Sequence, residues 1–431
     1  MIIVCDLLCK AMSHEKVNSG FIYGLSLAFP NETIKLYADA THIEAIKSIL
    51  VHDEIVVESF EFRPIILSKY MPFANILIQY FLLFRVFAEL IKLDVNKVFF
   101  LSFSPEILYV IKKLKCIRRF SQLKFTFVLH GGFETIADDI STYPSIKLPR
   151  TEIPSNIKFS VFEKIARTKL KNLPIKVYRK VILGITKISW LKREPSFFTV
   201  KKVMEWNHSS DYRYIALSPH ILRNAGKYID LNQFDFYSVF LPTNFVKPLD
   251  APVNTYAKFA TFGYGDSLVL HNVAYLLEQK KITRPYEIRV IGMDNRGAEG
   301  FVNVTTTSKG EVLARKDMER HALDIDAFLI LYDKKKYRLS CSGSILESLS
   351  MMKPVIHFDN DCINQFNSAK SPIGFCCYSL DEYIDKLADI IENYASYQVE
   401  FVKFRENILK LRARCAIEES ASEIRKSFTW E

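Results

Sequence analysis

The sequence predicts an α/β protein made of two doubly wound, Rossmann-like domains that face a cleft. The first reason is length, because 431 residues are too many for one compact core and suit two domains. The second is the alternation of short, continuously apolar runs with longer helical patterns, which is typical of parallel strands covered by helices on both faces. The third is that this alternation restarts after a proline-containing stretch at 245–256, which we interpret as the connection between the domains.

The first domain is expected over residues 1–245. Its strands are the apolar runs MIIVCDL, IKLYAD, EIVVESF, KVFFLSF, KFTFVLH and YRYIALS, which helical patterns separate. Residues 141–207 break this rhythm, because they open with three prolines and continue as a basic stretch. We therefore expect a basic helical insert there.

The second domain is expected over residues 246–395 and repeats the same order of elements. KFATF, YEIRVI, FVNVTTT and IDAFLILY are its first strands, and another strand follows Pro354. Residues 396–431 are helical to the end, and we expect these C-terminal helices to cross back to the first domain.

The net charge of +10 is concentrated in one segment. Between Lys158 and Lys202, thirteen Lys or Arg stand against two Glu, so this stretch carries +11 and the rest of the chain about −1. Basic amphipathic helices with an aromatic anchor such as Trp190 are typical of proteins that dock on anionic membrane surfaces. A basic insert that packs on its own domain is the alternative. No nucleic-acid-reading motif is present, so nucleic acid is not an expected partner.

Three features bear on the location of the protein. The most membrane-like run, 73–93, contains Arg85 and Glu89, so we expect a buried core helix there. The eight cysteines show no C-x-x-C pair and no zinc spacing, and no secretory signal is visible. We therefore expect reduced thiols in a cytoplasmic protein that is free or peripheral on the inner face of the membrane.

The stretch SCSGSILESLSMMKPVIHF contains the strongest candidate for a ligand site. A helix start presents unpaired backbone N–H groups and the positive end of its dipole. Gly343 lets a phosphate approach this backbone closely, and the hydroxyls of Ser342 and Ser344 add donors. Glu347, one turn later, can accept hydrogen bonds from ribose hydroxyls. The alternative is that Ser344 and Glu347 form a capping box that only starts a helix.

Two weaker candidates for phosphate contacts lie near this stretch. Gly263 and Gly265 in FGYGDS can make a tight turn at the end of a strand, although an ordinary strand-to-helix turn has the same letters. Arg338, in YDKKKYRLS, can add a positive charge, although a charged loop is usually just solvated.

His130 is the main candidate for catalysis in the first domain. It ends an apolar strand and precedes Gly131 and Gly132, so its imidazole is expected at the ligand-binding edge of the sheet. With a pKa near neutrality it can act as a base. Nearby carboxylates can serve instead, namely those of Glu134, Asp138 and Asp139. His14 is a weaker candidate, His220 is interpreted as a helix-start residue, and a purely structural His130 stays an alternative.

In the order of these elements, the chain resembles the GT-B glycosyltransferases. The likeness rests on KFATFGYGDS, YEIRVIGMD and DAFLILYDKKKYRLSCSGSILESLSMMKPVI in the second half, and on SGFIYGL and LHGGFE in the first. The sequence departs from the family at two places. Leu339 stands where retaining members with paired glutamates have a second Glu, and no Arg or Lys follows the turn at Gly263 and Gly265.

The resemblance implies a transferase that moves a sugar from a nucleotide-sugar donor to a carbohydrate, polyprenyl-linked acceptor in bacterial surface-polysaccharide synthesis. The donor would contact the second domain, and the acceptor and catalytic groups would lie in the first. The implied donor residues are Gly263, Gly265, Arg338, Ser342, Gly343, Ser344 and Glu347; the acceptor residues are Gly20, Tyr23 and Gly131; and the catalytic residues are His130 and Glu134.

We expect no cofactor and no obligatory metal, because the Asp-x-Asp formed by Asp324 and Asp326 begins a strand instead of ending one. Two other functions stay open. One is a different enzyme on the same plan, such as a nucleotide-sugar epimerase or a polysaccharide pyruvyl-type transferase. The other is a non-catalytic, membrane-associated assembly partner.

Overall fold

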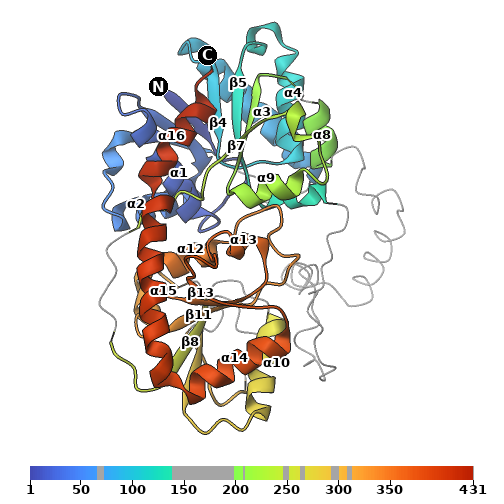
Figure 1. The fold of residues 1–431 in the computed structure, drawn as a ribbon. Helices are drawn as coiled ribbons and strands as arrows, with labels where there is room; N and C mark the ends of the chain where they lie inside the picture. The colour runs from blue at the N-terminus through green and yellow to red at the C-terminus, as the bar shows by residue number, and fades with distance from the viewer. Residues whose placement is uncertain are drawn as a thin grey trace, which may run out of the picture.

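A computed structural model confirms the predicted α/β fold with two parallel sheets (Figure 1). The structure describes residues 1–65, 72–137, 199–206, 209–245, 252–262, 267–292, 300–307 and 313–430. The predicted basic insert and the turn at Gly263 and Gly265 therefore lie almost wholly outside the described residues.

The sheet of the N-terminal domain has the strand order β3-β2-β1-β4-β5-β6-β7, and all neighbours are parallel. The central strands are apolar along their whole length because helices cover both faces of the sheet. The elements of this domain are β1 (Ile2–Cys5), α1 (Glu15–Ala28), β2 (Ile34–Asp39), α2 (Ala40–His52), β3 (Phe60–Ile65), α3 (Pro72–Lys92), β4 (Lys97–Phe100), α4 (Pro105–Lys115), β5 (Lys124–Leu129), α8 (Val200–Trp206), β6 (Tyr212–Ala216), α9 (Pro219–Ala225) and β7 (Asp235–Ser238).

Within the described residues, the third strand is an element that the sequence prediction misplaced. EIVVESF was expected to form it, but the strand begins at Phe60 and continues through Pro64, while Val57–Ser59 form a short 3-10 helix. β3 is an edge strand, where a proline is tolerated because one side of the strand needs no hydrogen-bond partner. The apolar pattern misled the prediction because Val56 is two-thirds exposed.

The C-terminal domain contains a second parallel sheet in the order β10-β9-β8-β11-β12-β13. Its elements are β8 (Ala257–Phe262), α10 (Ser267–Gln279), β9 (Tyr286–Ile291), β10 (Val304–Thr306), α11 (Arg315–Ala322), β11 (Ala327–Ile330), α12 (Gly343–Ser350), β12 (Val355–Phe358), α13 (Asp361–Asn364), β13 (Gly374–Cys377), α14 (Leu380–Glu392), α15 (Tyr394–Cys415) and α16 (Ile417–Phe428). Asp324 and Asp326 lie at the amino end of β11, where Asp324 pairs with Lys258 and Arg289.

The last two helices connect the domains. α15 runs along the C-terminal domain and α16 lies against α1 of the N-terminal domain (Figure 1). Helices α1 and α16 approach so closely that a Cβ on Gly24 of α1 would lie 2.7 Å from the Ile424 side chain of α16. Thr126 on β5 also donates a hydrogen bond to the Ser427 carbonyl (2.9 Å).

The apolar helix expected from the sequence is α3. Its described inner face, which includes Leu83, Val86, Phe87 and Leu90, is buried in the core of the N-terminal domain. Within the described ranges, no helix combines the length and the hydropathy needed to cross a bilayer.

Candidate functional site

The loop after β11 leads into α12, and Ser342 caps this helix. The Ser342 Oγ accepts a hydrogen bond from the Ser344 N–H at 3.2 Å. The capping box that the letters of Ser344 and Glu347 allow is therefore not formed, because Ser344 already lies inside the helix. The Glu347 side chain instead points away from the cap and toward the other domain.

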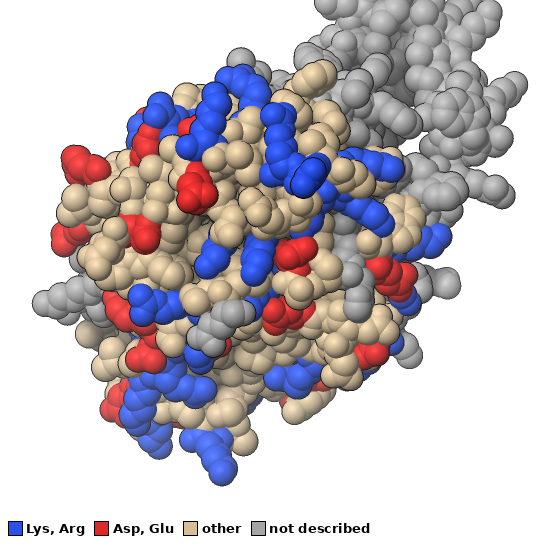
Figure 2. All heavy atoms as spheres, turned by 90° about the horizontal axis from the view of Figure 1, so that it is seen from above, with Lys and Arg blue, Asp and Glu red and all other residues tan. Residues whose placement is uncertain are grey.

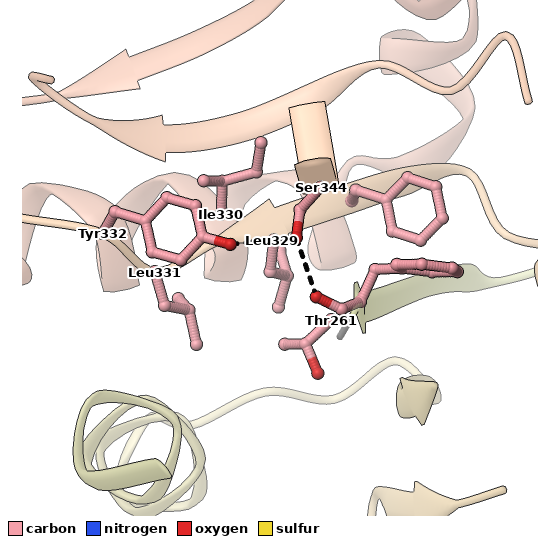
Figure 3. A pocket seen from close by; sticks show the side chains of 8 residues that line it. Thr261, Leu329, Ile330, Leu331, Tyr332 and Ser344 are labelled. Carbon is pink, nitrogen blue, oxygen red and sulfur yellow. Dashed lines mark hydrogen bonds between the residues drawn. The ribbon is translucent and has the colours of Figure 1, made fainter. Parts of the chain in front are cut away.

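The Ser344 hydroxyl belongs to a narrow polar contact between strand ends (Figure 3). It donates to the Phe262 carbonyl at the end of β8 (3.0 Å) and accepts from the Tyr332 hydroxyl (2.9 Å). The pocket beside it has an accessible volume of about 10 Å³, roughly enough for one water. Its lining residues are Thr261, Phe262, Phe328, Leu329, Ile330, Leu331, Tyr332 and Ser344. The hydroxyls of both serines are thus engaged within the protein, whereas Gly343 is exposed and a Cβ there would meet no described atom within 4 Å.

Glu347 is the centre of a buried ion-pair network that joins the two domains. Its Oε1 lies 3.0 Å from Lys16 Nζ in the first turn of α1, and its Oε2 pairs with the guanidinium of Arg315. Arg315 begins α11, and its Nε also donates to Glu319 at 2.7 Å. Lys16 Nζ lies 3.4 Å from the Ser350 hydroxyl as well. The start of α1, the start of α11 and the helix α12 therefore supply Lys16, Arg315 and Glu347 to one point.

The charges of this network determine the protonation of Glu347. Burial alone would raise the pKa of this carboxyl, but Lys16 and Arg315 together lower it to about 2. Burial lowers the pKa of Lys16, against the opposing effect of Glu347. The pKa of Arg315 is raised by Glu347 and Glu319 although burial opposes this. Glu347 is therefore ionised near neutral pH.

Of the two predicted catalytic residues, Glu134 contacts the other domain, whereas the contacts of His130 lie within the N-terminal domain. Glu134 accepts a hydrogen bond from the Ser340 hydroxyl in the loop before α12, and burial raises the pKa of its carboxyl. His130 is buried and its Nε2 lies 2.6 Å from the Leu101 carbonyl, so Nε2 carries the proton and Nδ1 keeps a lone pair. Its ring centroid lies 4.7 Å from that of His14. Burial and His14 lower the pKa of His130 to about 4, which leaves the imidazole neutral near pH 7.

His220 holds the loop before α12 from the side of the N-terminal domain. It lies in the first turn of α9, as predicted, and its Nε2 lies 2.9 Å from the Tyr337 carbonyl and 3.1 Å from the Ser340 carbonyl. Arg338, in the same loop, stacks over Tyr228 of the N-terminal domain at 5.9 Å. This arginine therefore contacts the opposite domain.

The predicted acceptor residues have different surroundings. Gly20 has a packing role, because a Cβ there would lie 2.3 Å from the Pro242 carbonyl oxygen. Tyr23 is half-buried near the charge of Glu418 on α16, and burial raises the pKa of its hydroxyl. Gly131 is exposed next to His130. The glycine pattern of α1 therefore reflects close packing at this position.

Sequence reasoning missed Lys16 and Arg315. Phosphate-binding cations were expected at the turn after β8, where the resemblance places them, and in the loop that carries Arg338. A Lys in the first turn of the first helix, four residues before Gly20, was a usable signal, because helix starts after central strands lie at the ligand edge of such sheets. Nothing in the sequence around Arg315 indicates that it meets Glu347.

Comparisons with known proteins find similarity in structure but none in sequence. No protein-family model matches the sequence, and no curated protein matches it. Sucrose-phosphate synthase from Thermosynechococcus elongatus is similar over 99% of this chain and 98% of its own, with a TM-score of 0.61 and 11% identity. The catalytic domain of starch synthase IV from Arabidopsis thaliana, bound to ADP and acarbose, has a TM-score of 0.60 at 9% identity over 99% and 98%.

A third similar structure is a variant of S. aureus TarM in complex with fondaparinux, alpha-GlcNAc-glycerol and UDP. Its TM-score is 0.57 at 10% identity, over 100% of this chain and 99% of that one. All three similarities extend over both domains and the C-terminal helices. The chain therefore has the GT-B fold, as its sequence resemblance predicted.

Proposed function

We propose that this protein is a glycosyltransferase that moves a sugar from a nucleotide-sugar donor to a carbohydrate acceptor. The observation that supports this most is the network of Lys16, Glu347 and Arg315 beside the start of α12 in a GT-B fold. Lys16 and Arg315 bring two cations to one largely buried point between the domains, where Glu347 and, for Arg315, Glu319 balance them in the free protein. Such a point suits the diphosphate of a nucleotide sugar, and the structures of similar fold include complexes with ADP and UDP.

The donor would displace contacts that the protein makes with itself. A diphosphate near Gly343 would draw Lys16 and Arg315 away from Glu347, because phosphate oxygens offer both cations stronger, charge-assisted hydrogen bonds. The carboxylate of Glu347 would then accept hydrogen bonds from the ribose hydroxyls. The exposed backbone at Gly343 would add N–H donors at the helix start. Gly263, Gly265 and Arg338 remain proposed donor contacts.

Catalysis would follow from positioning and charge neutralisation. Breaking the bond from the sugar to the phosphate leaves negative charge on the diphosphate, and Lys16 and Arg315 would stabilise it without an obligatory metal. His130 is neutral, with a lone pair on Nδ1, but its pKa of about 4 lies well below the near-neutral value expected from the sequence, so it is proposed only as a weak base for an acceptor hydroxyl. Glu134 is the second proposed base.

The acceptor is proposed to be lipid-linked, as in surface-polysaccharide synthesis on the inner face of the cytoplasmic membrane. Support comes from a basic surface on the N-terminal domain. Residues 112–124 contain six Lys or Arg and no acid, and Lys113, Arg118 and Arg119 are exposed. Figure 2 shows many Lys and Arg side chains over this domain. We call 112–124 the basic face; the basic stretch 158–202 is proposed to add to it and lies outside the described residues up to 198.

Aromatic side chains accompany these cations. Phe81 on α3 is 67% exposed and Trp206 on α8 is 40% exposed. The Arg119 guanidinium lies 4.9 Å from the centre of the Phe84 ring, and Lys112 lies 5.6 Å from that of Trp206. Cations beside aromatic rings at a surface, such as Lys112 beside the exposed Trp206, suit the boundary between lipid headgroups and acyl chains.

A two-step experiment tests the proposed function. UDP-, ADP- and GDP-sugars are first screened for thermal stabilisation of the protein, since a ligand that binds only the folded state raises the melting temperature. The best donor is then incubated with polyprenyl-linked and free oligosaccharides, and release of the nucleoside diphosphate is measured. Release that depends on an acceptor supports a glycosyltransferase, whereas no stabilisation by any nucleotide contradicts the proposal.

A further inference from the structure

A second buried polar cluster lies at the end of β1, within the N-terminal domain. Its members are Asp6, Cys9, Asn18 and His42, from the loop after β1 and from helices α1 and α2. Asp6, Asn18 and His42 are fully buried, and Cys9 is 5% exposed. The donor network of Glu347 uses none of these side chains.

The ligand atoms of three of these residues converge. One atom each from Asp6, Cys9 and His42 lies within 4.8 Å of the other two, and Asp6 Oδ2 lies 3.2 Å from His42 Nε2. A tetrahedral ion with bonds of about 2.0–2.3 Å holds its ligand atoms about 3.3–3.8 Å apart. Small side-chain rotations therefore suffice to bring the three atoms to this spacing.

The orientation of His42 is that of a metal ligand. Its Nδ1 lies 2.8 Å from the Ala11 carbonyl and donates a hydrogen bond to it. In the neutral ring the lone pair of Nε2 then faces the Asp6 carboxylate, an arrangement that a cation between them makes favourable. Metal-bound histidines usually donate their other ring N–H to a carbonyl or carboxylate in this way.

Asn18 can provide a fourth ligand. Its Nδ2 lies 2.6 Å from Asp6 Oδ2 and 2.9 Å from His42 Nε2, while its Oδ1 is buried and has no hydrogen-bond partner among the described residues. Rotating the amide by half a turn exchanges the two atoms. The carbonyl oxygen then points at the place where Asp6 and His42 converge and becomes a fourth ligand, while Nδ2 takes the buried position that has no partner among the described residues.

We propose that Asp6, Cys9, Asn18 and His42 bind one divalent transition-metal ion, with Zn²⁺ as the best match. A thiolate and an imidazole favour this class of ion over Mg²⁺ or Ca²⁺, and four protein ligands form a closed, structural site. On binding, the Cys9 thiol loses its proton to solvent and its sulfur bonds to the metal. The ion would fix the loop 6–14, which carries His14 to its contact with His130. This metal site is distinct from the donor site, for which no metal is proposed.

The hydrogen bonds already present describe the competing account. Asp6 Oδ1 accepts from the Ser102 hydroxyl at 2.8 Å and from the N–H groups of Leu8 and Cys9 at 3.1 and 3.0 Å. In a protonated His42, both ring nitrogens would donate, and the cluster would be a metal-free ion pair. The two accounts differ in what added metal does.

Cobalt substitution separates them. The purified full chain is treated with a chelator, dialysed and titrated with Co²⁺ and then Zn²⁺. We expect one metal ion per chain by elemental analysis and a sulfur-to-cobalt charge-transfer absorption that Zn²⁺ abolishes. Cys9→Ser should remove this absorption, whereas Cys116→Ser, at an exposed cysteine elsewhere, should keep it. A wild-type protein without the absorption, or a Cys9→Ser variant that keeps it, would overturn the proposal.

A second variant keeps the test decisive if Cys9→Ser fails to fold. Asn18→Asp places another carboxylate beside Asp6. With a metal between them, Zn²⁺ at a hundred times its Kd should raise the melting temperature of this variant by at least about 2 °C. In a metal-free ion pair the extra buried charge destabilises the protein and Zn²⁺ gives no rescue, which would contradict the site.

Discussion

Lys16 in the first turn of α1 and Glu347 on α12 form an ion pair across the domain boundary, with 3.0 Å between Nζ and Oε1. The two residues are 331 positions apart in the sequence. This contact places a cation of one domain on the residue that we assign to the donor ribose in the other. It therefore joins the two domains at the proposed donor site.

Replacing Glu347 by Gln should destabilise the free protein. The change leaves the largely buried Lys16 without its countercharge and leaves Arg315 with Glu319 alone, and breaking a buried pair costs about 3–5 kcal/mol. Urea unfolding measures the loss. Glu400→Gln, at an exposed position on α15, should change stability by less than about 0.5 kcal/mol. Equal stability of the two variants would show that the network contributes nothing to folding.

Stability should fall as the pH is lowered from about 6.5 to about 4 because of His357. This ring is fully buried, with Nδ1 donating to the Phe358 carbonyl and Nε2 accepting from Asn367, and burial lowers its pKa to about 4. Between these pH values the unfolded chain binds a proton that the folded chain does not. The free energy of unfolding therefore falls by up to about 1.4 kcal/mol for each pH unit. Urea unfolding at several pH values should show a shallower slope for His357→Gln, and an unchanged slope would refute the assignment.

Two glycines should respond in opposite ways to alanine. Gly20→Ala drives a Cβ into the Pro242 carbonyl and should cost about 1–3 kcal/mol of stability. Gly343→Ala meets no described atom and should leave stability nearly unchanged. If a phosphate approaches this backbone, the same substitution should weaken nucleotide binding. A Gly343→Ala protein that binds nucleotides normally would remove the close approach from the proposal.

Charge removal on the basic face should weaken binding to anionic vesicles. Replacing Lys113, Arg118 and Arg119 by Ser removes roughly 1 kcal/mol per cation, or about a hundredfold in affinity at low salt. Co-sedimentation with phosphatidylserine-containing and with neutral vesicles measures this loss of affinity. Added salt should reduce the difference in binding between the wild type and the variant. The matched control replaces three exposed lysines of the C-terminal domain, Lys281, Lys403 and Lys410. Equal losses in both variants would indicate a nonspecific charge effect.

The fold could be predicted because its signal is local. Strands such as Ile2–Cys5 and Lys124–Leu129 are buried on both faces, so their letters are apolar throughout and helical patterns separate them. The edge strand at Phe60–Ile65 was misplaced because one side of it has no neighbour and its pattern is therefore weak. The position of such an edge strand depends on which side chains the fold buries, and this cannot be read from the sequence.

The candidate site could be predicted only in part. The helix start at Gly343 and the position of His130 at a strand end follow from local patterns, and the structure has both. The cations at Glu347 come from segments 331 and 32 positions away, so no local spacing relates them to it. Ser342 caps α12, whereas the sequence also allowed Ser344, two residues later, as the cap. Both serines have the side chain that an N-cap position favours, so the sequence could not decide between them.

Isothermal titration with UDP, ADP and GDP tests the central claim most directly. At least one nucleoside diphosphate should bind the wild-type protein, and Lys16→Met and Arg315→Gln should each weaken it about 10- to 150-fold, since a hydrogen bond to a charged group contributes about 1.5–3 kcal/mol. Lys403→Met, on the outer side of α15, should bind like the wild type. Failure of every nucleotide to bind, or undiminished binding by both the Lys16 and the Arg315 variants, would contradict the account.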